Sequence, residues 1–213
     1  MVVAGGEVMS NGLLFYWFSW ILWILVTFFM RKNKYRLVLA CWLLLLILCS
    51  GFQLSLDGFK LSLSYPLILI GALILHTKIP RIYFHVFVSL TIMIGYTGVL
   101  IWENQLPLEH FFPPMLIISC FLYILMAAMT TGFWSRLACG LLGMAGGELL
   151  YSIIIADFSI PNVIGDKRFL DLMLVLMVVA VCHDSALRLK LKLAKKFRTS
   201  AAKSKPFFRK QAQ

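Results

Sequence analysis

Seven apolar stretches, each about 20 residues long, make up most of the chain and are separated by short polar loops. A helix of about that length crosses ~30 Å of hydrocarbon, and it pairs its own backbone polar groups within the segment. The sequence therefore predicts an all-α fold, a polytopic integral membrane bundle. We place the seven transmembrane helices at residues 12–30, 37–55, 59–75, 82–102, 112–131, 135–156 and 168–187.

Composition supports a membrane domain and leaves no room for a soluble one. Hydrophobic residues make up 61% of the chain and charged residues 14%, whereas soluble domains carry about 25% charged residues. The predicted helices leave only short loops, too short for a further domain. We expect one transmembrane domain at residues 1–187, followed by a basic cytoplasmic tail at residues 188–213.

The placement of lysine and arginine predicts the orientation. The loops after the first, third and fifth predicted helices, together with the tail, hold 17 of the 20 basic residues. An excess of basic residues marks the cytoplasmic side, so we expect a multi-pass protein of the cell membrane with its N-terminus outside and its C-terminus cytoplasmic. The third predicted helix fits this threading least well, because Pro66 precedes a short apolar run, Leu67–Leu75. A re-entrant segment is the alternative, but it would put every later loop on the wrong side for its charge.

Glu148 lies near the middle of the sixth predicted helix. A charged carboxyl there costs about 2.5–3.5 kcal/mol on insertion scales, which favours protonation, a partner or a hydrated cavity. The fourth predicted helix carries a polar stripe at helical spacing, which we expect to face the bundle interior. The candidate intramembrane polar site comprises Glu148, Ser152, His85, Ser89, Tyr96 and Glu103. We favour interhelical hydrogen bonding for it; the alternative is a hydrated path for protons or small polar solutes.

Small residues follow one side of the helix that carries Glu148. The residues predicted to pack against another helix are Gly140, Gly143 and Gly147. Glycines at this spacing allow two helix backbones to approach closely. The sequence therefore predicts tight helix packing beside Glu148.

For the other polar residues within apolar segments, their positions in the sequence favour structural roles. We expect Asp171 to stabilise the N-terminus of the seventh helix, and His183 and Asp184 to be solvated at the membrane interface. The five cysteines lie in apolar stretches without any CxxC pair, so we expect small buried apolar side chains and neither disulfides nor a zinc site. We expect no metal, no cofactor and no nucleic-acid partner.

Ten of the twenty basic residues lie from Arg188 onward, and the whole chain has a formal net charge of +11. We predict that residues 187–198 extend the seventh helix, and that residues 199–213 are disordered. Binding of anionic lipid headgroups is the favoured role, and docking of an acidic protein is the minor alternative. The predicted headgroup-binding residues are Arg188, Lys190, Lys192, Lys195, Lys196 and Arg198.

The aromatic run Phe15-Tyr16-Trp17-Phe18-Ser19-Trp20, followed by the loop Arg31-Lys32-Asn33-Lys34-Tyr35-Arg36, resembles the YphA-type family of small bacterial membrane proteins. The likeness covers mainly the first third of the chain. It implies a bacterial cell-membrane location and no particular activity or site.

Motifs of known chemistry do not occur in this sequence. It contains no HExxH, no GxSxG and no Gly-rich phosphate loop, so we expect no enzymatic role. The favoured function is a structural or interaction protein of the membrane, binding another membrane protein or itself. The alternative is a small transporter or a proton- or cation-conducting protein that uses Glu148 and the polar face of the fourth helix.

Overall fold

The computed structural model describes residues 12–30, 32–56, 59–105, 114–156 and 163–203. Most of these residues are helical, which confirms the prediction of an all-α fold in its main part. The elements, in chain order, are α1 (Leu13–Ile24), the π-helical turn η2 (Leu25–Phe29), α2 (Lys34–Cys49), β1 (Gln53–Leu56), β2 (Phe59–Ser62), α3 (Ser64–Thr77), α4 (Ile82–Gln105), α5 (Pro114–Met129), α6 (Phe133–Ala156), β3 (Val163–Ile164) and α7 (Lys167–Lys203).

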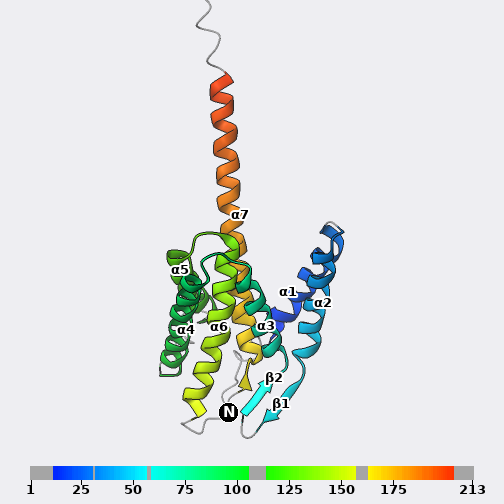
Figure 1. The fold of residues 1–213 in the computed structure, drawn as a ribbon, viewed down its shortest axis with the longest axis vertical. Helices are drawn as coiled ribbons and strands as arrows, with labels where there is room; N and C mark the ends of the chain where they lie inside the picture. The colour runs from blue at the N-terminus through cyan, green and yellow to red at the C-terminus, as the bar shows by residue number, and fades with distance from the viewer. Residues whose placement is uncertain (1–11, 31, 57–58, 106–113, 157–162, 204–213) are drawn as a thin grey trace, which may run out of the picture.

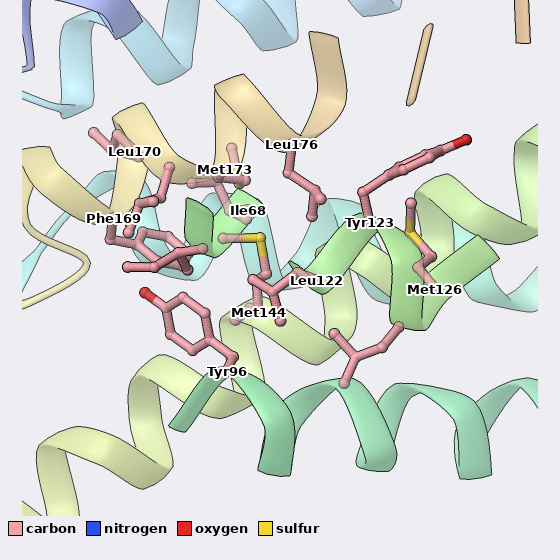
Figure 2. Close-up of a cluster of buried hydrophobic side chains, with 14 of the residues drawn as sticks. Ile68, Tyr96, Leu122, Tyr123, Met126, Met144, Phe169, Leu170, Met173 and Leu176 are labelled. Carbon is pink, nitrogen blue, oxygen red and sulfur yellow. The ribbon is translucent and has the colours of Figure 1, made fainter. Parts of the chain in front are cut away.

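Five helices, α3 to α7, form a bundle with α1 and α2 at one side (Figure 1). The most extensive helix contact joins α4 to α6, while α1 rests on α7 and α2 on α3. The strands lie at one end of the bundle, here called the strand end, and α7 projects from the other, here called the tail end. Apolar side chains from α4, α5, α6 and α7 fill the interior (Figure 2), among them Ile92, Leu122, Met144, Phe169 and Leu176.

Helix length divides the apolar helices into two groups. Three of the described helices are long and apolar enough to cross a membrane: Ile82–Glu103, Phe133–Ala156 and Lys167–Lys195. Four shorter apolar helices of 10–17 residues complete the set: Leu13–Phe29, Arg36–Cys49, Ser64–Thr77 and Met115–Met129. Each predicted segment thus contains an apolar helix, and four of those helices are shorter than about 20 residues.

The predicted helices at 37–55 and 59–75 were wrong at their shared boundary, where the structure has strands. β1 pairs antiparallel with β2, with Leu54 opposite Leu61, and β2 pairs parallel with β3. Polar and apolar residues alternate along Gln53–Leu56, the period of a strand rather than of a helix. The Asp57-Gly58 dipeptide that separates the strands in sequence favours a two-residue hairpin turn. Because α3 begins only at Ser64, Pro66 lies in its first turn, where proline is tolerated.

The seventh helix is longer than predicted. α7 continues to Lys203, so the prediction of disorder was wrong for residues 199–203, and residues 204–213 lie outside the described part of the chain. The sequence from Lys167 to Lys203 contains neither glycine nor proline, the residues that most often end or kink a helix. Helix α7 therefore passes residue 187 without interruption.

Candidate functional site

Glu148 of α6 is buried and joins three elements through its carboxylate. The Tyr96 hydroxyl on α4 donates a hydrogen bond to Oε2 at 2.8 Å. The backbone N–H of Gly165, between β3 and α7, donates to Oε1 at 3.3 Å. Only 4% of the Glu148 surface is exposed, and each oxygen has a donor, as a buried carboxyl requires.

The contact between α4 and α6 is close enough for Glu148 to meet Tyr96 because glycines lie between the helices. A Cβ on Gly143 would lie 2.7 Å from Ile92 Cβ, and one on Gly147 would lie 2.7 Å from Tyr96 Cδ1. The Thr97 hydroxyl completes the contact, reaching the Gly147 carbonyl oxygen at 3.0 Å. These distances leave no room for a methyl group at either glycine, in line with a small-residue packing face.

Gly140 lies on the same helix but meets different neighbours. A Cβ there would approach Met126 Sδ of α5 at 2.9 Å and Leu176 of α7 at 3.6 Å. A methionine side chain can move aside more easily than a backbone atom. The three predicted packing glycines are therefore all buried, but only Gly143 and Gly147 set the α4–α6 distance.

The turn between β3 and α7 is shaped by Gly165, which has φ = 72°. A Cβ at this position would lie 2.6 Å from Tyr65 Cβ, so both the backbone angle and the space require glycine. The Tyr65 hydroxyl donates to the Ala145 carbonyl oxygen of α6 at 2.7 Å. The rings of Tyr65 and Tyr96 lie 6.1 Å and 6.5 Å from that of Phe169, so packed aromatic rings adjoin the carboxyl of Glu148. Tyr96 and Phe169 are labelled in Figure 2.

Charged residues at the strand end join α4 to α7. Asp166 accepts a hydrogen bond from the Phe169 N–H at 2.8 Å and so caps the N-terminus of α7. Desolvation raises the pKa of the Asp166 carboxyl, and the Phe169 N–H and the Arg168 guanidinium oppose that rise. Arg168 forms an ion pair with Glu103 near the end of α4.

The six residues of the predicted polar site do not form one cluster. Tyr96 and Glu148 bond to each other, and Glu103 pairs with Arg168 at the strand end. Two more members of the stripe are buried near the start of α4: Ser89 donates to the His85 carbonyl oxygen at 2.9 Å. Ser152 is buried one turn beyond Glu148. The polar stripe thus faces the interior, and at Ser89 the hydrogen bond stays within α4.

Asp171 is fully buried, and its role differs from the predicted one. It lies in the second turn of α7, and its carboxylate accepts hydrogen bonds from the backbone N–H groups of Gly12, at 3.0 Å, and Phe15, at 2.6 Å. It therefore caps the N-terminus of α1 rather than that of its own helix. An acid within an apolar run was the sequence signal, but the partner helix could not be inferred from it.

Two histidines at the tail end contact aromatic partners. His76, which the sequence analysis did not single out, is buried at the end of α3, with its ring 6.4 Å from that of His85. His183 lies 5.3 Å from the Tyr123 ring, and Asp184 accepts from Arg188 at 2.6 Å. His183 and Asp184 are half-buried, and each also has a contact within the protein.

The described residues include no group of three or more histidine, cysteine, aspartate or glutamate side chains arranged to hold a metal ion. All five cysteines have free thiols. Cys139 is buried, whereas Cys41, Cys120 and Cys182 are exposed on helix surfaces, so the expectation that all five are buried was wrong.

The sequence model of the YphA-like integral membrane proteins matches residues 11–206. The chain belongs to this family. The match covers far more than the first third on which the resemblance rested, and it confirms that this YphA-like chain is an integral membrane protein. A curated relative, "Uncharacterized protein YphA" from Bacillus subtilis (strain 168), is 26% identical over 158 residues, which are 74% of this chain and 79% of that protein. No solved structure matches this YphA-like protein.

Proposed function

We propose that this protein is a non-enzymatic structural or interaction protein of the bacterial cell membrane that crosses the bilayer seven times. Its N-terminus lies outside and its C-terminus in the cytoplasm. The direction of the helices supports this threading: Gly143 faces Ile92 and Gly147 faces Tyr96, so α4 and α6 run the same way. Phe169 contacts Tyr96 and Leu176 approaches Gly140, so α7 runs the opposite way.

The four shorter helices are compatible with crossing. A helix of 16 residues, such as α5, is about 24 Å long, and a bilayer thins locally around short segments at modest cost. Their exposed side chains suit lipid, as in the outward-facing Trp17, Phe28 and Ile124. The basic loops all follow odd-numbered helices, as this threading requires.

The observation that supports the proposed role is that both carboxylate oxygens of Glu148 accept hydrogen bonds within the protein. Its two oxygens accept hydrogen bonds from α4 and from the β3–α7 turn, at the place where two glycines bring α4 and α6 into close contact. A carboxyl used in this way joins helices and is held by them, which suits a rigid scaffold.

The orientation can be tested by tag accessibility. A protease-cleavable tag at the C-terminus should be cut only after inverted membrane vesicles are prepared, and a tag at the N-terminus only in intact spheroplasts. The physical reason is the basic tail, which is held on the cytoplasmic side during insertion. Cleavage of both tags in one preparation would mean an even number of crossings.

Proteoliposomes distinguish the scaffold from the transporter. We expect purified protein, reconstituted with a trapped pH-sensitive dye, to give the same proton leak as protein-free liposomes, and E148Q to give that leak too. Asp184→Asn is the matched control, since it neutralises an acid that pairs with Arg188 away from the site. A proton or cation flux that is present in the natural protein and in D184N but absent in E148Q would establish transport instead.

A further inference from the structure

Helix α7 is too long to end within the bilayer. Its 37 residues give about 55 Å of helix, whereas a bilayer with its headgroups is about 40–45 Å thick. The Arg188 guanidinium lies over the Phe133 ring of α6, 6.0 Å from its centroid, and beyond this contact α7 projects from the tail end of the bundle (Figure 1). With Lys167 at the opposite surface, Arg188, Lys190 and Lys192 reach the level of the headgroups, and the turns beyond Lys192 extend into water.

The helix has no point at which it could turn to lie along the membrane. Sharp kinks arise at proline, at glycine or where the backbone ladder is interrupted. Residues 167–203 contain no glycine or proline and are helical throughout. The last turns of α7 are therefore presented to the aqueous phase as a rigid rod.

Helix α7 carries an apolar stripe that continues from the bilayer onto this rod, on the side away from the bundle. The stripe consists of Cys182, Ala186, Leu189 and Leu193, all exposed, at steps of four, three and four residues. Cys182 and Ala186 lie within about 30 Å of Lys167 and therefore at the depth of the hydrocarbon, whereas Leu189 and Leu193 lie beyond it. Leu189 is 59% exposed and Leu193 47%, although both lie at or beyond the headgroup level. Steps of three and four place these residues on one face, as in the seam of a coiled coil.

The charge around the stripe determines which kind of molecule can bind to it. Exposed basic residues accompany it on the neighbouring and opposite faces, and the chain contains no acidic residue after Asp184. A second copy would bring basic side chains against basic ones, which a coiled-coil seam disfavours. A nucleic acid offers nothing for two exposed leucines to pack against. An acidic amphipathic helix satisfies both the leucines and the charges.

We infer that the stripe and the basic residues around it bind an acidic amphipathic helix of a partner protein on the cytoplasmic side. This inference rests on the proposed interaction role and names its partner by chemistry. Arg188, Lys190 and Lys192 lie at the headgroup level beside Leu189, and the partner helix packs on Leu189 and Leu193, where the stripe leaves the bilayer.

The test uses the full chain in nanodiscs of neutral phosphatidylcholine and a synthetic helical peptide of about four heptads, with leucine at a and d and glutamate at e and g. Fluorescence anisotropy should show saturable binding. The double variant L189S/L193S should bind at least about tenfold more weakly, since each substitution removes a buried leucine from the seam. The matched control is Leu187→Ser, an exposed leucine of the same helix outside the stripe, and it should bind as the natural chain does.

Several outcomes would overturn the inference. They are no binding of the acidic peptide, equal binding of a version with lysine in place of glutamate, and binding that L189S/L193S leaves unchanged. Protection of a label at Ala201 from an aqueous quencher, seen only with anionic lipid, would assign the tail to the membrane. A dimer lost in L189S/L193S would assign the stripe to a second copy. Proton flux or a reversed topology would defeat the proposed function while peptide binding in nanodiscs still stood, so the two failures are distinguishable.

Discussion

Replacing Gly143 and Gly147 together by alanine is expected to lower the free energy of unfolding by about 2–6 kcal/mol, because overpacking costs ~1–3 kcal/mol at each site. Each new methyl group would lie within 2.7–2.9 Å of α4 atoms, including the backbone oxygens of Ser89 and Met93. Backbone atoms cannot move aside singly, so α4 and α6 must separate. That separation would also lengthen the bond between Tyr96 and Glu148. Reversible unfolding in bicelles, followed by steric trapping, measures the change.

Gly98 provides the matched control on α4. A Cβ there meets no atom within 4 Å, so G98A should leave stability unchanged or raise it slightly, since alanine favours the helix over glycine. Equal stability of the G143A/G147A variant and G98A would show that the two helices do not pack as closely as the structure has them.

Replacing Asp171 by alanine is expected to cost about 2–5 kcal/mol, because two buried N–H groups at the start of α1 lose their acceptor. The carboxylate is fully buried and bonds to Gly12 and Phe15, so neither water nor a nearby side chain can readily replace it. The loss should act mainly on α1 and α2, which lie at the side of the bundle. Hydrogen exchange monitored by mass spectrometry should therefore show faster exchange at residues 13–29 than in α4 or α6.

Two further variants separate the loss of the α1 cap from the general effect of removing an acidic side chain. Asp171→Asn keeps one acceptor oxygen and should lose less stability than D171A. Asp184→Ala removes an acid that pairs with Arg188 one turn away on the helix surface, and it should cost well under 1 kcal/mol. If D171A exchanged uniformly faster across all helices, Asp171 would support the whole bundle and not α1 in particular.

The site was predictable to the extent that spacing along one helix determines it. Glu148 in an apolar run and the glycines at helical spacing indicated a buried carboxyl beside a tight helix contact, because residues three and four apart share a face. Tyr96 was placed on the interior face of its helix for the same reason. That Tyr96 and Glu148 bond to each other depends on the relative position of α4 and α6, which no local pattern specifies.

Two of the contacts that the sequence analysis did not predict join residues that are distant in the sequence. Gly165 donates to Glu148 from 17 residues away, and Asp171 caps a helix more than 150 residues earlier. The strands escaped notice because their two-residue period is short and lies between strongly apolar segments. His76 lies at the end of an apolar run, and only the packing of α3 on α4 brings it beside His85.

The amino-acid sequence by itself determined that this chain is a helical membrane protein of the YphA-like family and which residues are too polar to face lipid, because burial in hydrocarbon depends on composition and length. The sequence also indicated that the seventh helix continues past residue 187. The tertiary structure decided which of those polar groups meet and that a small sheet closes one end. These arrangements depend on contacts between segments that are distant in the chain. The free energy of each hydrogen bond there depends on the position and orientation of both partners.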